Sequence, residues 1–417
     1  MSKRSTVLQL LNVIDEWSLA LDQGNDIDCI YFDFMKAFDT VAHKRLHNKL
    51  KAYSLSETVI KWIMDFLSNR RQRVIVNGAS SSWRIVTSGI PQGSVLGPLL
   101  FIIFINDIVE QISSSIYLFA DDTKLFRAIT SNHDNTLLQS DIDKLVEWSN
   151  TWLLSFHPDK CKTMHVGNQD NVYTYHLMAK STMHELQCVT QEKDIGVIFD
   201  AQLEFDKHIN AKINKANAIF AMIRRSYKFL NMEIFLHLYK ALVRSNIEYA
   251  NSVWCPYKMK YIESVENVQR RATRTIPELK GLSYGERLQK LKLPTLVYRR
   301  LRGDMIETFK MINGYYDSRV IPKFVFRDSD MLRGHSKMLL KVRFNKKLRS
   351  YSFTQRIINI WNSLPEGLVS APSVNSFKNR LDKLWSNQQV KYDFKATLQY
   401  SNYYKFNINE ELDIEDP

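Results

Sequence analysis

Hydrophobic residues recur at helical spacing near the start of the chain. This spacing predicts an amphipathic helix that ends before the turn-prone sequence at residues 22–25. The mostly apolar segment at residues 28–33 then has the pattern of a strand that ends in an aspartate. The apolar face of the helix consists of Val7, Leu10, Leu11, Ile14 and Trp17.

The following part of the chain alternates between helical and extended patterns. Residues 99–110 predict a buried helix, and the apolar arms of residues 116–126 predict a hairpin around Asp121 and Asp122. Helix, strand and hairpin in this order are typical of a split βαβ arrangement. The other predicted elements are two helices within residues 41–69 around Tyr53-Ser54, a hairpin of strands 73–76 and 83–87 with a turn at Asn77-Gly78, and a loop at 88–94.

Beyond residue 205 the pattern becomes helical and basic. Basic residues alternate there with Ile213, Phe220 and Ile223, which predicts a helix that buries one side and offers the other to phosphates. Three more basic clusters, at 269–274, 298–302 and 341–349, are interleaved with aromatic residues suited to stacking on unpaired bases. For each cluster alone, a solvated face is the alternative interpretation. The basic candidates are Lys212, Lys215, Arg224, Arg225, Arg270 and Arg271.

The charge is distributed unevenly along the chain. Residues 1–200 hold 19 Lys and Arg against 23 Asp and Glu, a net −4, whereas residues 201–400 hold 37 against 16, a net +21. Such an excess favours a polyanionic partner, and nucleic acid is the one that counterion release explains best. Residues 401–417 hold one basic and five acidic groups, which indicates a small acidic tail.

Composition limits the remaining classes. With 417 residues, 45% of them hydrophobic, the chain can form two or three globular domains. The four cysteines form no Cys-x-x-Cys pair, so neither a disulfide framework nor a cysteine-rich zinc site is expected. The longest apolar stretch, residues 95–105, is short and contains Gly97 and Pro98, and no secretory leader is evident. We therefore expect an intracellular protein, nuclear or cytoplasmic, without a membrane partner.

Three aspartates carry the candidate chemistry. Asp33 ends a predicted strand, and Asp121 and Asp122 lie at the tip of a predicted hairpin. Three carboxylates held close together repel one another unless cations lie between them. Two Mg²⁺ ions, with Mn²⁺ as an alternative, would suit such a site and the nucleotidyl transfer that it could perform. An ordinary polar turn is the alternative for Asp121 and Asp122 taken alone.

Three sequence blocks resemble one enzyme family. They are FDFMKAFD at residues 32–39, GIPQGSVLGPL at 89–99 and FADD at 119–122. With these blocks the chain resembles the reverse transcriptases of non-LTR retrotransposons, in particular those of jockey-type elements, and further similarity at residues 361–381 extends the resemblance over nearly the whole chain. The resemblance implies an RNA-directed DNA polymerase. It also implies an α+β fold: a polymerase palm with split βαβ topology and an antiparallel sheet, a helical thumb, and a basic, mainly α-helical C-terminal region.

The resemblance also implies roles for individual residues. Asp33, Asp121 and Asp122 would be the metal ligands, and Phe38 would exclude a ribonucleotide 2′-hydroxyl. Gln92 and Gly93 would meet the incoming nucleotide and template. In weaker blocks, Lys160 would donate a proton to pyrophosphate and Gly196 would allow close approach in a primer-grip hairpin. The alternatives are a solvated loop lysine and a plain surface hairpin.

The predicted domains are a palm with a residual fingers-side helix at 1–204, a thumb at 205–300, a basic region at 301–400 and the acidic tail. Expected partners are an RNA template, a DNA primer or target, and deoxynucleoside triphosphates. Family members carry a fingers region ahead of the segment that resembles residues 3–6, so we expect an N-terminally truncated copy. Two functions remain open, a working polymerase and a catalytically inactive nucleic-acid-binding remnant, and a group II intron maturase-like polymerase is less favoured.

Overall fold

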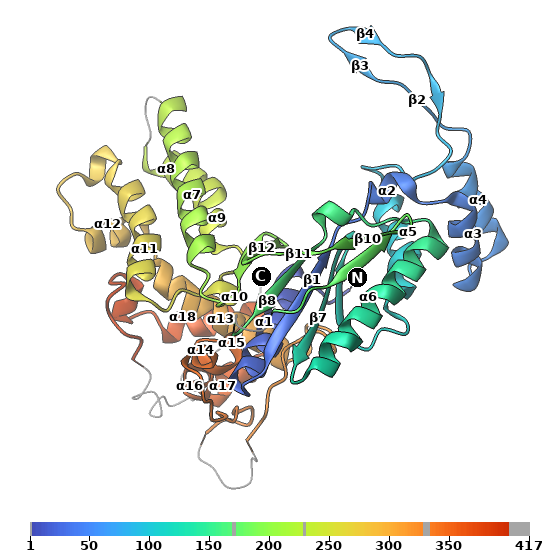
Figure 1. Ribbon diagram of the computed structural model, residues 1–417. Helices are drawn as coiled ribbons and strands as arrows, with labels where there is room; N and C mark the ends of the chain where they lie inside the picture. Colours follow the sequence, from blue (N-terminus) through green and yellow to red (C-terminus); the bar gives the residue numbers. More distant parts are fainter. Residues whose placement is uncertain (1, 169–171, 228–230, 328–333, 400–417) are drawn as a thin grey trace. The chain divides into compact units, whose positions relative to one another are not determined.

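The structure is a computed structural model that describes residues 2–168, 172–227, 231–327 and 334–399 (Figure 1). These residues form two compact units. The first unit is Asn25–Ile195, and the second combines the residues before it with those from Gly196 onward. The first helix thus groups with the second unit, whereas the sequence analysis assigned it to a domain at 1–204. The predicted acidic tail, 401–417, lies outside the described residues.

A mainly antiparallel sheet forms the centre of the first unit. Its strands lie in the order β11, β8, β1, β7, β6, and β1 pairs antiparallel with both β7 and β8. Only β11 runs parallel to its neighbour, β8. The bounds are β1 Asp26–Phe32, β6 Ser115–Phe119, β7 Asp122–Ile129, β8 Lys162–Val166 and β11 Gln187–Cys188. The α+β class and its antiparallel sheet are confirmed.

Two helices pack their apolar side chains against this sheet. The sequence of α5 (Leu96–Ile105) contains no charged residue, and five of its ten residues are buried. The predicted helix at 99–110 is divided in the structure into α5 and a short 3-10 helix, η1 (Asn106–Val109). Side chains of α5, of β1 and of α6 (Asn132–Trp152) belong to one core cluster.

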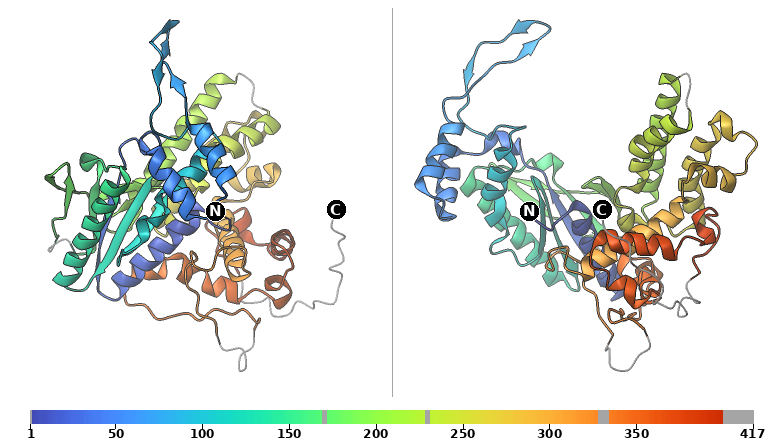
Figure 2. Two further views of the ribbon diagram at one scale, coloured as in Figure 1. Left: turned by 90° about the vertical axis from the view of Figure 1, so that its right-hand side faces the viewer. Right: turned by 180° about the vertical axis from the view of Figure 1, so that it is seen from behind.

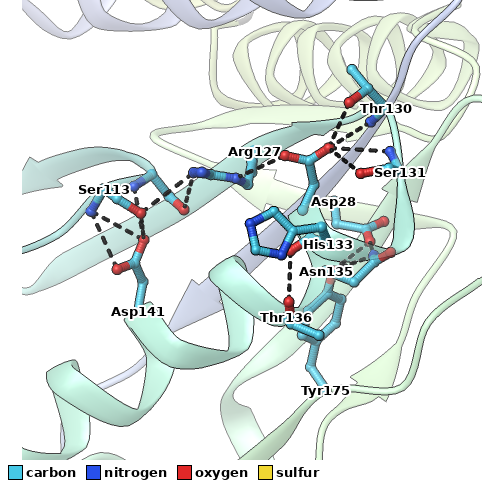
Figure 3. A network of polar contacts seen from close by, with 12 residues as sticks. Asp28, Ser113, Arg127, Thr130, Ser131, His133, Asn135, Thr136, Asp141 and Tyr175 are labelled. Atoms are coloured by element: carbon cyan, nitrogen blue, oxygen red, sulfur yellow. Dashed lines mark hydrogen bonds and ion pairs between the residues drawn. The ribbon is translucent and has the colours of Figure 1, made fainter.

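A buried polar network fixes α6 to the sheet (Figure 3). The carboxylate of Asp28 on β1 accepts hydrogen bonds from Asn135 Nδ2 of α6 at 2.9 Å and from the Tyr175 hydroxyl at 2.6 Å. Its other oxygen lies 2.5 Å from His165 Nδ1 of β8. Because Asp28 is 2% exposed, these partners compensate for burial of its charge. The network therefore fixes β1, the strand that Asp33 follows.

Three helices and a hairpin arm follow β1. A short helix, α2 (Ala37–Thr40), precedes α3 (His43–Ala52) and α4 (Glu57–Leu67), which meet around Tyr53-Ser54 as predicted. Residues 70–87 then form an arm that projects away from these helices (Figures 1 and 2). Its strands are β2 (Arg71–Gln72) with β5 (Arg84–Ile85), and β3 (Ile75–Val76) with β4 (Ala79–Ser80). The arm turns at Asn77-Gly78, which confirms the predicted turn. The predicted pairing of 73–76 with 83–87 is wrong, because β3 pairs with β4 directly after the turn and β5 pairs with β2 instead.

Shorter elements complete the first unit. They are the 3-10 helix η2 (Pro158–Lys160), the hairpin of β9 (His176–Ala179) and β10 (Thr182–Glu185), and β12 (Gln191–Asp194). The division between the units falls at Ile195–Gly196, just before β13 (Val197–Asp200).

The described part of the second unit is mainly helical. Its longer helices are α1 (Thr6–Asp22), α7 (Asp206–Ser226), α11 (Met259–Arg274), α12 (Tyr284–Leu291), α13 (Leu296–Ile312) and α18 (Val374–Leu384). Shorter ones are α8 (Met232–Leu238), the π-helix η4 (Tyr239–Arg244), α9 (Ser245–Glu248), α10 (Asn251–Trp254), η5 (Pro277–Leu279), α14 (Lys347–Ser350), α15 (Phe353–Arg356), α16 (Ile358–Asn362), α17 (Glu366–Val369) and η7 (Gln389–Lys391). No helix in the described ranges has the length and apolarity needed to span a bilayer.

Hydrogen bonds explain why α1 belongs to this unit. Arg349 Nη1 lies 2.5 Å from Asp15 Oδ1 and donates to the Ser18 hydroxyl at 2.7 Å. At the end of α1, the carboxylate of Asp22 accepts the backbone N–H groups of Asn345 and Lys346 at 2.7 and 2.6 Å. The predicted first helix is confirmed, but its partners come from the distant C-terminal part of the chain.

Candidate active site

Asp33 lies at the end of β1, where the strand meets a loop. Its backbone N–H donates to Cys161 Sγ at 3.4 Å, and its carbonyl accepts the N–H of His157 at 2.8 Å. These contacts hold Asp33 against the loop that contains Lys160. The Lys160 ammonium lies 3.6 Å from Asp33 Oδ1, and the Asp33 side chain is 45% exposed. The backbone of Asp33 is therefore fixed, and its carboxylate is open to solvent.

Asp121 and Asp122 lie where the hairpin of β6 and β7 turns. The two strands pair as far as Phe119 and Asp122, so Ala120 and Asp121 form the turn between them. Ala120 has φ +52°, a left-handed conformation that costs a residue with a side chain roughly 1 kcal/mol. This tight turn leaves both aspartates exposed at the tip.

The register of the sheet relates Asp33 to Asp122. Strands β1 and β7 pair antiparallel, and their last pair is Phe32 with Thr123. One further step along the same register places Asp33 opposite Asp122. Directly opposed residues of an antiparallel pair have Cβ atoms about 5 Å apart, which is close enough for their carboxylates to share cations. Continuing this register thus puts two of the predicted ligands at facing positions, with the third in the adjoining turn.

Electrostatics agree with this placement. Partial burial raises the pKa of Asp122, and the negative charges of Asp121, Asp194 and Asp33 raise it further, while Lys124 opposes them. The carboxylates of the predicted triad therefore act on one another through their charges. A cation bound among them would relieve this repulsion.

The sequence analysis missed a buried ion pair beside these acids. Lys124 lies two residues after Asp122 on β7, and its ammonium contacts Asp194 Oδ2 of β12. The two side chains are only 3% and 7% exposed. A lysine within the apolar arm of the predicted hairpin is the signal that could have revealed a buried partner.

The loop at 88–94 is fixed against the segment after β1. The N–H groups of Gly89 and Ile90 donate to the carbonyls of Val41 and Phe38 at 2.8 and 2.7 Å. Gly89 has φ +87°, and a Cβ there would lie 2.6 Å from the Asp39 carbonyl oxygen. Only glycine fits this position without a shift of the backbone.

The same loop lines a cavity of about 530 Å³. Gln92 lines it with Asp39, whose Oδ1 accepts a hydrogen bond from Gln92 Nε2 at 3.4 Å, and with Lys36 and Arg70. Gly93, with φ +80°, has open space around its Cα. Phe38 is instead half-buried, with its ring stacked on Phe101 at a centroid distance of 4.6 Å.

Comparison with known proteins places the chain in a family. A model of the family described as reverse transcriptase (RNA-dependent DNA polymerase) matches residues 5–234. The chain belongs to the reverse transcriptase family. The match contains all three aspartates, the 88–94 loop and Lys160.

Curated relatives are similar to the chain over about two thirds of its length. The chain is 28% identical over 293 residues to the RNA-directed DNA polymerase from mobile element jockey of Drosophila funebris, covering 66% of this chain and 31% of the relative. It is 27% identical over 279 residues to the probable RNA-directed DNA polymerase from transposon X-element of Drosophila melanogaster, covering 63% and 30%. The chain thus spans about a third of the length of these relatives. The resemblance to jockey-type elements is confirmed.

A solved structure of telomerase from Candida tropicalis, in complex with a fragment of telomeric RNA, is also similar. It covers 89% of this chain and 52% of the telomerase chain at 11% identity, with a TM-score of 0.39. A TM-score this low does not establish a common fold.

In the second unit, α7 confirms the predicted amphipathic pattern. Ala216, Phe220 and Ile223 are buried on one side, whereas Lys215, Arg224 and Arg225 are exposed. Lys212 is half-buried, with its ammonium 5.6 Å from the centre of the Tyr249 ring. Gly196 has φ +83°, and a Cβ there would lie 3.2 Å from the same ring.

The other basic clusters differ in how free their side chains are. Arg271 is exposed, but the Arg270 guanidinium packs about equally close to the rings of Tyr284 and Phe394, at 5.2 and 5.1 Å. In the cluster at 298–302, Arg299 pairs with Glu248, Arg302 pairs with Asp382, and Arg300 is buried. Arg349 of the cluster at 341–349 pairs with Asp15. These paired arginines join separate helices of the second unit, so part of the charge of these clusters is balanced within the protein.

The donor chemistry of the site fits a divalent cation. Reverse transcriptases as a family use divalent metals, and carboxylate oxygens are ligands that Mg²⁺ prefers. Within the ranges that the structure describes, however, no three His, Cys, Asp or Glu side chains are gathered closely enough to form a preformed metal site. The three aspartates therefore have suitable donor chemistry, but their carboxylates do not form a preformed metal site.

Proposed function

We propose that this chain is an RNA-directed DNA polymerase that extends a primer 3′-hydroxyl with deoxynucleotides, as a step in retrotransposition. The observation that supports this most directly is the register of β1 and β7, which sets Asp33 opposite Asp122 with Asp121 in the adjoining turn. The family match over residues 5–234 supports the same activity.

Asp33, Asp121 and Asp122 would hold two Mg²⁺ ions, for which Mn²⁺ could substitute. When bound, such ions activate the attacking hydroxyl and neutralise charge on the leaving pyrophosphate. The protein supplies the positions of the carboxylates, which are set by the sheet register and by the tight turn at Ala120. Lys160 would donate a proton to the pyrophosphate, and its ammonium is near enough to Asp33 for that role.

The loop and cavity beside this centre would hold the nucleotide and template. Gln92 and Gly93 lie in a loop whose backbone is held by Val41 and Phe38, so a substrate would meet a preorganised surface. Phe38 would exclude a 2′-hydroxyl, and its packing on Phe101 keeps the ring in one orientation.

The nucleic-acid partners would be an RNA template and a DNA primer or target, with deoxynucleoside triphosphates as substrates. Exposed Lys215, Arg224, Arg225 and Arg271 offer charge for the phosphates. Lys212, Arg270 and Gly196 would support that surface through their contacts with aromatic rings. We propose a location inside the cell, in the nucleus or the cytoplasm, where such partners occur.

Primer extension on an RNA template with Mg²⁺ and the four deoxynucleotides tests this function. Asp122→Asn should reduce extension by at least about a hundred-fold because it removes a charged ligand that a two-metal site needs. Asp65→Asn is the matched control, since Asp65 is an exposed acid on α4. Equal extension by the wild type and Asp122→Asn would contradict the proposal.

A second candidate is a catalytically inactive nucleic-acid-binding remnant. The net +21 of residues 201–400 favours it, since that charge supports binding without any chemistry at Asp33. Salt-sensitive RNA binding by the wild type, with no extension in either Mg²⁺ or Mn²⁺, would favour this candidate over the polymerase.

A further inference from the structure

The hairpin arm at residues 70–87 exposes an unusual number of large apolar side chains. Figures 1 and 2 show it extending beyond α3 and α4, and all of its residues from 71 to 85 are exposed. Several of these exposed residues are large and apolar, which costs free energy in water and often marks an interaction surface. They are Val74 at 66%, Ile75 at 58%, Val76 at 62%, Trp83 at 57% and Ile85 at 68% exposed.

All charged residues of the arm are positive. It holds four arginines and no aspartate, glutamate or lysine. Oriented single-sign charge attracts a polyanion, and an arm without carboxylates presents no repulsion to phosphates. The four residues are Arg70, Arg71, Arg73 and Arg84.

The pairing of the strands separates the arm into two faces. Arg71 pairs with Ile85, and Gln72 pairs with Arg84, so these pairs lie on opposite faces. Continuing the alternation puts Arg73 and Trp83 on the face of Arg71. Their contact supports this, because the Arg73 guanidinium lies 4.7 Å from the centre of the Trp83 ring. One face thus combines two arginines with an aromatic ring, and the other carries Arg84.

The base of the arm continues into the cavity of about 530 Å³ that Gln92 also lines. Ile85, on the face of Arg71 and Trp83, lines this cavity, and so does Gln72 from the opposite face. Arg70, the remaining arginine, donates to the Gly89 carbonyl at 2.6 Å and so joins the arm to the 88–94 loop. A chain bound along the arm would therefore lead into that cavity without leaving the surface.

We propose that the arm binds single-stranded nucleic acid, with a base stacked on Trp83 and phosphates contacted by Arg71 and Arg73. An exposed ring beside arginines accepts any base because every base has a π-face, whereas a duplex keeps its bases stacked internally. An acidic protein would also satisfy the charge, but it would not require a flat ring held by a guanidinium. The arm is thus a second contact, outside the residues that carry the polymerase proposal.

Fluorescence anisotropy with labelled, unstructured RNA and DNA oligonucleotides of about 20 nucleotides tests this site, since single-strand sites span fewer. Trp83→Ala should weaken binding by about ten-fold, whereas Trp83→Phe should keep the affinity within about two-fold because a ring remains. Trp62→Ala is the matched control, since Trp62 is an exposed tryptophan on α4, 59% exposed. Tighter binding of RNA would identify the ligand as a template, and tighter binding of DNA as a primer or target strand.

Two variants that remove the same charge distinguish binding at this site from general electrostatic attraction of nucleic acid to the arm. Arg73→Gln and Arg84→Gln remove the same charge from the same arm, but only Arg73 lies on the face of Trp83. Arg73→Gln should cause the larger loss. Equal losses in the two variants, equal losses for Trp83→Ala and Trp62→Ala, or a duplex bound as tightly as a single strand would overturn the proposal. A change in self-association without a change in oligonucleotide affinity would also overturn it, in favour of a protein partner. The assay requires no polymerase activity, so it remains decisive if primer extension fails.

Discussion

At the scale of single residues, the acids around Asp122 favour cation binding. The same repulsion among their negative charges destabilises the protein when no metal is bound. Asp121, Asp194 and Asp33 all raise the pKa of Asp122. The negative potential that holds a proton there also attracts Mg²⁺, so protons and metal compete for the same carboxylate. Mg²⁺ affinity should therefore fall as the pH is lowered through the raised pKa.

This competition has a measurable effect on stability. Folding raises the pKa of Asp122, so protonation of this carboxyl favours the folded state. Its contribution to the free energy of unfolding is complete below the ordinary pKa of 3.8 and is lost as the pH rises through the pKa of the folded protein. At neutral pH in EDTA, Asp122→Asn should raise the melting temperature by about 1 °C, a small effect because the side chain is exposed to solvent. Circular dichroism melts with EDTA and with Mg²⁺ check this. Mg²⁺ should stabilise the wild type more than the variant, and a lower melting temperature of the variant in EDTA would contradict the prediction.

The ion pair of Lys124 and Asp194 should have a larger effect, because both side chains are buried. Lys124→Met leaves the Asp194 carboxylate without its cation, and removing one partner of a buried pair costs about 3–5 kcal/mol of unfolding free energy. Urea denaturation measures this loss. The double variant Lys124→Met/Asp194→Leu should recover much of it, since no charge remains unpaired.

An exposed pair provides the control for that experiment. Lys51 and Glu57 are 50% and 79% exposed at a distance of 3.5 Å, so Lys51→Met should cost less than about 1 kcal/mol. A double Lys124/Asp194 variant no more stable than Lys124→Met alone would show that the pair is not the source of the loss.

The proposed metal ligands and the buried pair differ in how far the sequence predicts them. Asp33, Asp121 and Asp122 could be found because each stands in a local pattern, at a strand end or a hairpin tip. Lys124 and Asp194 are separated by 70 positions, and nothing local marks them as partners. Only the path of the chain through the sheet shows that β12 supplies the carboxylate.

At the scale of elements, two glycines of the 88–94 loop distinguish two reasons for a glycine. One is a left-handed backbone conformation, and the other is the close approach of a neighbouring backbone atom. Gly89 and Gly93 have similar φ angles of +87° and +80°, but only Gly89 has a backbone atom in the space of a Cβ. Gly93→Ala should cost about 1 kcal/mol for its left-handed conformation. Gly89→Ala should cost clearly more, because the Asp39 carbonyl must also move. Urea denaturation compares the two, and equal losses would show that the close approach is relieved without cost.

In the hairpin arm, the sequence pattern predicts the turn and the strands but not how the strands pair. The turn at Asn77-Gly78 and the presence of two strands follow from the sequence. The pairing shifts by one residue between the β2–β5 and β3–β4 pairs. This shift depends on Ser81, whose N–H donates to the Val74 carbonyl and whose hydroxyl accepts the Val74 N–H, both at 2.9 Å. A serine within a polar run carries no sequence signal for such a bulge.

At the scale of the whole molecule, some basic residues pair with acids of the protein and others remain exposed. Composition alone does not distinguish the two groups. The net charge of +21 over residues 201–400 includes Arg299, Arg302 and Arg349, which pair with acids distant in the sequence. Other residues, such as Arg224 and Arg225, remain exposed. The grouping of α1 with the C-terminal helices has the same origin, since its acids meet partners more than 300 positions away. Local periodicity predicts each helix but not these long-range partners.

The salt dependence of RNA binding distinguishes the two uses of charge. The slope of log K against log salt reports the phosphates neutralised, at about 0.7 per contact for a single strand. Replacing exposed Arg224 and Arg225 on α7 by Gln should therefore reduce the slope by about 1.4. Lys44→Gln/Lys61→Gln removes the same charge from exposed positions on α3 and α4 and should leave the slope nearly unchanged. Anisotropy titrations over a salt series measure both variants. Equal reductions in the two would mean that RNA follows the net charge of the protein and that α7 has no special part in binding.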